Sequence, residues 1–135
     1  MWAFARWRAL SRHDKRLALH AAVVTSIAAA GLRSVGAGRM LRLANRRVSG
    51  RGLTAQQIHD RAIAVDRAGR YVPGGTCLSK SLALAWVLRG RGVPASTRLG
   101  VRTEGGFAAH AWVEIDGAPL AESPAEFAPL PAGRT

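Results

Sequence analysis

Apolar positions recur at helical spacing along the chain as far as Gly90. Together with the turn residues between the apolar runs, they predict four helices: 12–30, 40–48, 55–68 and a last one from residue 77 up to Gly90. The first is expected to end at Gly31, the first of three glycines that interrupt the pattern. The third begins with a capping-box pattern, Thr54 followed by Gln57. This part of the chain is therefore expected to be built from helices.

Beyond Pro94 the period of the apolar residues changes from about 3.6 to 2, which is the period of a β-strand. Two strands are predicted, Ala95–Arg102 and Phe107–Ile115. Asp116–Gly117 is a strong hairpin signal, and it leads into a short strand near Ala118–Glu122. Helices followed by a small antiparallel sheet are typical of the α+β class, so we expect the helix that bears Cys77 to pack on this sheet.

The length and the charge pattern indicate one domain, residues 1–135, with a basic helical part over 1–53 and a core over 54–130. Residues 1–76 carry 14 Lys and Arg against 3 Asp and Glu, whereas residues 77–135 carry 6 against 5. Such a basic surface attracts nucleic acid, an anionic membrane or an acidic protein partner, unless it is only a solvated basic helical face.

A single cysteine excludes an internal disulfide, and no second Cys or His lies near it at zinc-ligand spacing. No metal and no cofactor is therefore expected, and a reducing, cytoplasmic setting fits best. The apolar run over 21–32 is shorter than the roughly 20 residues that span a bilayer, and no clear cleavage site follows it. A signal peptide is not favoured, and association with a membrane stays open.

Cys77 lies at the predicted start of a helix. The unpaired N–H groups and the positive dipole end of a helix N-terminus stabilise a thiolate. Gly74–Gly75 just before it would let a substrate approach closely, and the N–H of Cys77 could donate to an oxyanion. A lone cysteine is more often inert, so Cys77 alone is either a buried small residue or a nucleophile.

A nucleophile needs a base, and the chain offers four histidines: His13, His20, His59 and His110. In the second strand the residues of the apolar face are Phe107, Ala109, Ala111, Val113 and Ile115. His110 lies on the other face with Trp112 and Glu114, which makes it either a semi-buried structural residue or a catalytic base.

An acid to orient His110 is harder to place. Glu114 and Asp116 are about 13 Å and about 20 Å further along the extended chain. A three-residue or bulged turn at Asp116–Gly117 would make Glu122 a diagonal neighbour of His110, whereas a two-residue turn would put Glu122 on the wrong face. A bulged turn is therefore predicted if Glu122 is the third catalytic residue.

The stretches CLSKSLALAWVLRGRGVPA, RLGVR and GGFAAHAWVEIDGAPLAES together resemble the transglutaminase-like cysteine peptidases of lasso-peptide biosynthesis, the lasso B2 proteins. The close match covers about residues 71–127, and the basic N-terminal half matches in character only. The resemblance implies a transglutaminase-like, papain-like core over 54–130. It also implies a leader peptidase that cleaves a ribosomally made precursor peptide next to the threonine that is the penultimate leader residue.

By this resemblance Cys77 is the nucleophile, His110 the base and Glu122 the third residue, where the family usually has aspartate. Lys80 stands where the family more often has arginine, and we interpret it as a helix-surface or helix-contact residue. Asp116 is assigned to the turn.

The resemblance also implies partners: the precursor peptide with its leader, a separate leader-binding recognition protein and the ATP-dependent lasso cyclase. The basic helices of residues 12–70 are a reasonable docking surface for one of them. Two alternatives stay open. One is an amide transferase that uses the same three residues with an amine acceptor. The other is a non-enzymatic basic module that binds nucleic acid, which is disfavoured because the arginines are not interleaved with aromatics. No nucleic-acid partner is therefore expected.

Overall fold

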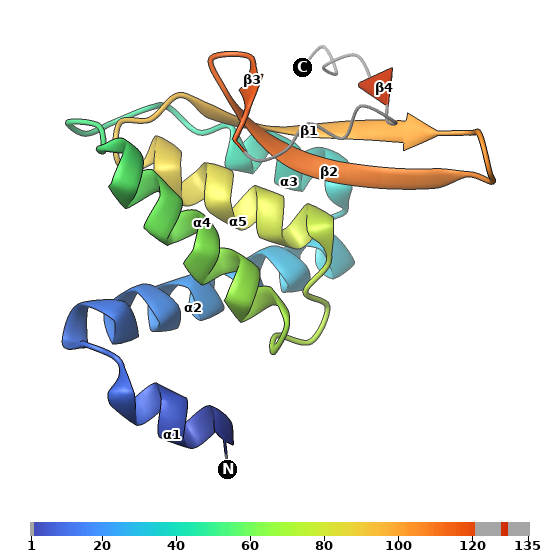
Figure 1. Cartoon of the computed structure of the whole chain (residues 1–135). Helices are drawn as coiled ribbons and strands as arrows, with labels where there is room; N and C mark the ends of the chain where they lie inside the picture. The colour runs from blue at the N-terminus through green and yellow to red at the C-terminus, as the bar shows by residue number, and fades with distance from the viewer. Residues whose placement is uncertain (1, 121–127, 130–135) are drawn as a thin grey trace.

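A computed structural model describes residues 2–120 and 128–129 of the chain, drawn in colour in Figure 1. The elements in this part are α1 (Trp2–Ala9), α2 (Arg12–Ser34), α3 (Ala37–Ala44), α4 (Ala55–Gly69), α5 (Cys77–Arg89), β1 (Ala95–Arg102), β2 (Ala108–Ile115), β3 (Ala118–Pro119) and β4 (Ala128–Pro129). Helices come first and an antiparallel sheet follows, so the predicted α+β class is confirmed.

The elements form layers, with α2 on one side, α4 and α5 in the middle and the sheet on the other side (Figure 1). Leu82, Ala85 and Leu88 of α5 are almost completely buried between the layers. Ala21 and Ala28 of α2 belong to the same hydrophobic core. The core therefore extends across the expected boundary between residues 53 and 54.

The first predicted helix was expected to end at Gly31, and this is wrong. α2 continues through Gly31 to Ser34, and α3 begins at Ala37 rather than at Met40. Gly31 serves packing instead, since a Cβ there would lie 2.4 Å from the sulfur of Met40. α1 was not predicted, because its apolar residues do not gather on one face of the helix.

The sheet has the strand order β3-β2-β1-β4, and β1 pairs with β2 in the antiparallel register that sets Thr97 opposite Val113. Thr97, Ala111 and Val113 are buried, and the Thr97 hydroxyl donates to the Ser81 carbonyl of α5 at 3.1 Å. The apolar face predicted for the second strand is thus confirmed at Ala111 and Val113. It is wrong at Phe107, which is 77% exposed, and at Ala109, which is also exposed, because the β1–β2 hairpin extends beyond the helices (Figure 1).

The turn between β2 and β3 is a two-residue turn. Ile115 pairs with Ala118, and Asp116 and Gly117 have φ values of 51° and 81°, as a type I′ turn requires. Leu120 continues the same register with a 2.9 Å hydrogen bond from its N–H to the carbonyl of Val113. A three-residue or bulged turn was predicted only on the condition that Glu122 is the third catalytic residue, and the structure has the two-residue turn that Asp and Gly favour.

Candidate active site

The start of α5 is held by a capping box around Cys77, and the predicted helix start is confirmed. Thr76 accepts a hydrogen bond from the Ser79 N–H at 3.2 Å, and the Ser79 hydroxyl accepts one from the Thr76 N–H at 2.8 Å. Cys77 and Leu78 are the first two helical residues, so their N–H groups have no acceptor within the helix. Unpaired donors at the positive end of a helix dipole can stabilise an oxyanion.

Ser79 also fastens the loop that leads into the helix. It is completely buried, and its hydroxyl lies 3.0 Å from the Gly74 carbonyl and 3.1 Å from the Thr76 carbonyl. A single buried side chain therefore joins the loop before Cys77 to the first turn after it. This capping box was not predicted, because the usual pattern has Glu or Gln three residues after the cap, whereas here Ser79 occupies that position.

Two glycines bring the end of α4 against this loop. A Cβ on Gly75 would lie 2.0 Å from the Gly69 carbonyl oxygen, and a Cβ on Gly69 would lie 2.3 Å from Cδ of Lys80. The Lys80 ammonium in turn pairs with Asp66 of α4 at 3.1 Å. Lys80 is thus a helix-contact residue, as predicted, and the loop before Cys77 rests on the last turn of α4.

His110 comes to this region from β2. Its ring stacks on that of Trp112 with 6.2 Å between the centroids, and both side chains are half-buried. Glu114, two residues further on, accepts a hydrogen bond from Arg98 of β1 at 3.0 Å. The carboxylate of Glu114 is therefore engaged across the sheet with the neighbouring strand.

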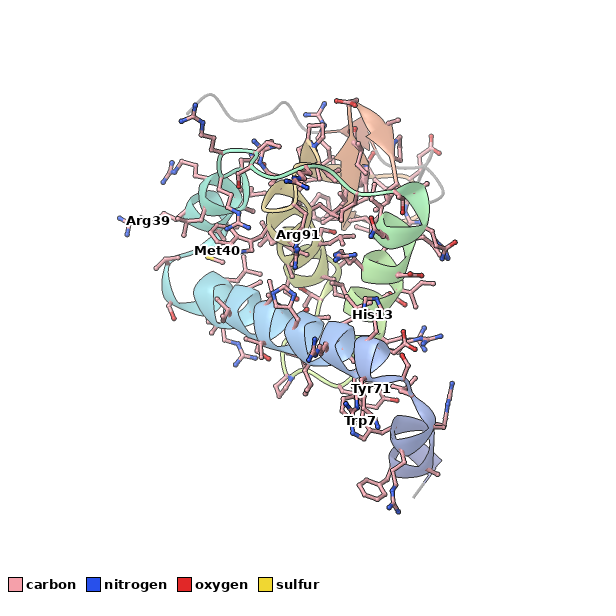
Figure 2. All side chains as sticks on the ribbon, turned by 90° about the vertical axis from the view of Figure 1, so that its left-hand side faces the viewer. Trp7, His13, Arg39, Met40, Tyr71 and Arg91 are labelled. Atoms are coloured by element: carbon pink, nitrogen blue, oxygen red, sulfur yellow. The ribbon has the colours of Figure 1, made fainter. Side chains whose placement is uncertain are left out.

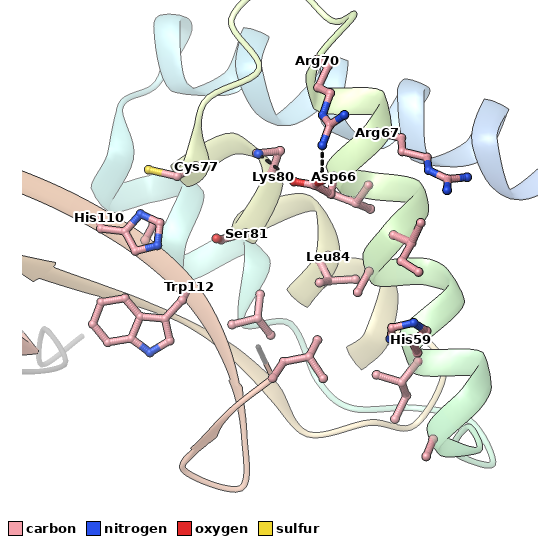
Figure 3. Close-up of a pocket in the computed structure, with 18 residues that line it drawn as sticks. His59, Asp66, Arg67, Arg70, Cys77, Lys80, Ser81, Leu84, His110 and Trp112 are labelled. Carbon is pink, nitrogen blue, oxygen red and sulfur yellow. Dashed lines mark hydrogen bonds and ion pairs between the residues drawn. The ribbon is translucent and has the colours of Figure 1, made fainter. Parts of the chain in front are cut away.

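Cys77 and His110 line the same cavity, which has a volume of about 740 Å³. Figure 3 shows both side chains at one end of the cavity and His59 at the other end, whereas His13 and His20 lie on α2 and do not line it. The cavity thus collects the lone cysteine and two of the four histidines. No three Cys, His, Asp or Glu side chains of the described ranges come together as metal ligands.

The walls of the cavity come from α4, α5, β2 and Leu120. Its lining combines apolar side chains, Ile58, Ala62, Ile63, Leu84 and Val113, with the charged side chains of Asp66, Arg67, Arg70 and Lys80. Asp66 is paired with Lys80 and with Arg70, the latter at 3.4 Å. Ile58 and Ala62 are four residues apart in α4, a spacing that predicts an apolar helix stripe but does not indicate that the stripe faces a cavity.

Glu122, the third residue of the predicted site, lies outside the described residues. The register argument that was to bring it beside His110 depended on a bulged turn, and the turn has two residues. Its role therefore stays a prediction.

The sequence model of the family described as "Transglutaminase-like superfamily" matches residues 21–131. Neither the curated proteins nor the solved structures contain a significant match to the chain. The family match begins within α2 and includes both Cys77 and His110. It therefore covers the residues that line the cavity as well as the helix that packs beneath them.

Proposed function

Because the chain belongs to the transglutaminase-like superfamily, whose members are generally enzymes of the cysteine-peptidase type, we propose that it is a leader peptidase for a ribosomally made lasso precursor peptide. The observation that supports this most is that Cys77, at a helix start, and His110, on a strand, line one cavity. The volume of about 740 Å³ lies in the range of sites that enclose small ligands or several side chains.

In the proposed mechanism the Cys77 thiolate attacks the carbonyl carbon of the scissile peptide bond. The N–H groups of Cys77 and Leu78 stabilise the oxyanion that forms. The C–N bond then breaks, and the leaving amine takes its proton from the His110 imidazolium. His110 next removes a proton from water, which attacks the thioester and releases the leader with a free carboxylate. The family resemblance alone assigns Glu122 to orient the imidazole, since the two-residue turn removes the register argument for it.

The cavity suits a peptide in two respects. Its apolar lining residues can take the side chains next to the scissile bond, and its charged lining has three basic residues against one acidic residue. An excess of basic residues attracts an acidic peptide segment, so we assign the leader to this side of α4. The separate leader-binding protein and the cyclase stay the proposed partners, and the lone cysteine favours the cytoplasm.

The test is cleavage of the precursor peptide in the presence of its leader-binding partner, followed by mass spectrometry. Cys77→Ala and His110→Ala should abolish cleavage or reduce it by at least about a thousandfold, and Glu122→Ala should reduce it least. The matched control is Cys77→Ser, which keeps the size of the side chain and should also be inactive while unfolding at the wild-type temperature. A Cys77→Ala protein that still releases the leader would overturn the proposal.

A second candidate is amide transfer, which the superfamily match supports equally. Both reactions pass through the same acyl-enzyme, and only the acceptor differs, water or an amine. Product mass separates them: a released leader with a free carboxylate indicates hydrolysis, and a leader joined to an added amine indicates transfer. Superfamily membership favours either enzyme over a nucleic-acid module.

The thiol itself can be tested without a substrate. Cys77 is half-buried, so a small reagent can reach it. A nucleophilic cysteine should react with iodoacetamide near neutral pH in the folded protein, faster than in a His110→Ala variant. Equal rates in the two proteins would mean that His110 does not act on Cys77.

A further inference from the structure

The outer face of α2 carries large apolar side chains that no other part of the described chain covers. Leu19, Val23 and Ile27 are 57%, 56% and 62% exposed, and their spacing of four residues puts them on one side of the helix. The opposite side, with Ala21 and Ala28, is buried against α4 and α5. A helix that is apolar on both sides is normally covered on both sides.

By length and composition α2 is also the one helix of the described residues that could cross a membrane, with a mean hydropathy of 1.4 over its most apolar 18 residues. To cross a membrane, α2 would have to leave the hydrophobic core, because its inner face packs against α4 and α5 (Figure 1). To lie flat on a membrane surface, α2 could keep these contacts. The folded domain can therefore present the outer face to lipid without any rearrangement.

Two polar residues on the exposed side are already satisfied inside the helix. Ser26 donates its hydroxyl hydrogen to the Ala22 carbonyl at 2.7 Å, and Ser34 donates to the Ala30 carbonyl at 2.8 Å. A hydroxyl that bonds to its own backbone loses less when it leaves water. The face from Leu19 to Ser34 is therefore less polar than its composition indicates.

The charges around this face select an anionic partner. Arg12 and Arg16 precede Leu19 along the same side of the helix, and no acidic residue occurs between Lys15 and His59. If a second copy of the chain covered this face, the arginines of the two copies would lie close together and repel each other. The exposed residues are aliphatic and lie on a helix whose hydropathy is that of a membrane helix. Protein interfaces are more often anchored by aromatic residues, so this face fits a lipid surface better than a protein partner.

α1 adds an aromatic and basic edge to the same side of the molecule. Figure 1 and Figure 2 both show α1 beyond α2, on the side away from the sheet. Phe4 is 65% exposed, and the Arg8 guanidinium lies 5.7 Å from the centre of its ring. Aromatic side chains beside arginines are typical of segments that lie at a membrane interface.

We propose that the outer face of α2, together with α1, binds the surface of an anionic lipid bilayer, with α2 lying in the plane of the interface. No residue of α2 lines the cavity that holds Cys77 and His110, so the cavity stays open in the bound state. The proposal does not depend on the reaction assigned to that cavity.

The experiment is sedimentation of the full chain with vesicles of phosphatidylcholine alone and of phosphatidylcholine mixed with phosphatidylglycerol, at low and high salt. The chain should bind the mixed vesicles more tightly, and high salt should weaken the binding. The double change Val23→Ser and Ile27→Ser should reduce the partition coefficient at least about tenfold. Arg12→Gln with Arg16→Gln should give a similar loss on mixed vesicles only.

Phe107→Ser is the matched control, since Phe107 is 77% exposed but lies in the β1–β2 turn. It should bind vesicles as the wild type does, and all variants should unfold at the wild-type temperature because the altered side chains are exposed. The proposal is overturned if the wild type does not bind mixed vesicles, or if the Val23 and Ile27 changes leave binding intact. It is also overturned if those two changes instead dissociate a dimer in solution, because the face would then belong to a second copy.

Discussion

Gly75 offers a direct test of how the chain positions Cys77. A Cβ at this position would lie 2.0 Å from the carbonyl oxygen of Gly69 and 2.8 Å from its carbonyl carbon. Both are backbone atoms, which no rotamer change can move aside. The φ angle of Gly75 is not in the left-handed region, so an alanine there meets only the steric problem. We expect Gly75→Ala to lower the free energy of unfolding by about 1–3 kcal/mol, as overpacked sites do.

Thermal unfolding followed by circular dichroism measures this effect. In a domain of 135 residues a loss of 1 kcal/mol lowers Tm by about 3–5 °C, so Gly75→Ala should lower it by about 3–15 °C. Gly38→Ala is the matched control, because Gly38 is helical and has no atom within 4 Å of an added Cβ. It should raise the free energy of unfolding by up to about 1 kcal/mol. A Gly75→Ala protein with the wild-type Tm would refute the close approach of α4 to the loop before Cys77.

Three further changes test other contacts by chemical denaturation. Ser79→Ala removes a completely buried hydroxyl and its hydrogen bonds to the loop, so the free energy of unfolding should fall by about 1–3 kcal/mol. An unchanged free energy of unfolding would mean that the capping box does not stabilise the helix start. Arg98→Met leaves the Glu114 carboxylate, whose side chain is 9% exposed, without its partner and should cost about 1–3 kcal/mol. Glu114→Gln added to Arg98→Met should recover part of that loss, and no recovery would contradict the pairing. Burial and the nearby charge of Arg91 lower the pKa of Arg61, while Asp60 acts the other way and the guanidinium donates to the Gln57 carbonyl at 3.2 Å. Arg61→Met should therefore change the midpoint of unfolding little, and a clear loss of stability would contradict this.

Local signals in the sequence predicted the elements that depend on local chemistry. The capping box at Thr54 and Gln57 is present with hydrogen bonds of 2.9 and 3.2 Å, and α4 runs over Ala55–Gly69, one residue longer than predicted. The change of period after Pro94 likewise located β1 to the residue. Caps and periodicity are sufficient where an element is specified by its own residues.

Long-range packing was not visible in the same way. Gly31 looked like a break, but it lies inside α2, with the Met40 side chain in the space that a Cβ would occupy. The same residue type can end a helix or admit a neighbour, and only the tertiary contact distinguishes the two. For the same reason the stripe of Ile58 and Ala62 predicted an amphipathic helix but not the cavity that it faces.

The turn after β2 is a different case. The Asp116–Gly117 pair was recognised as a hairpin signal, and it is the pair that the two-residue type I′ turn prefers. A bulged turn was predicted only if Glu122 is the third catalytic residue, because it would carry Glu122 to His110. The turn chemistry of the two residues decided the structure, so the strand register gives no support to Glu122.

The basic N-terminal part shows that a change in charge does not mark a boundary in the fold. The first 76 residues carry 14 Lys and Arg against 3 Asp and Glu, and this contrast is a property of the surface. The buried side of α2 contributes Ala21 and Ala28 to the core that α5 shares with the sheet, and the superfamily match begins at residue 21. The two faces of α2 therefore differ. Its inner face packs against α4 and α5, which line the cavity. Its outer face is exposed and apolar, with arginines beside it. The core of the domain requires only the inner face. The apolar residues of the outer face are therefore explained by contact with something other than this domain, as in the proposed binding to a bilayer.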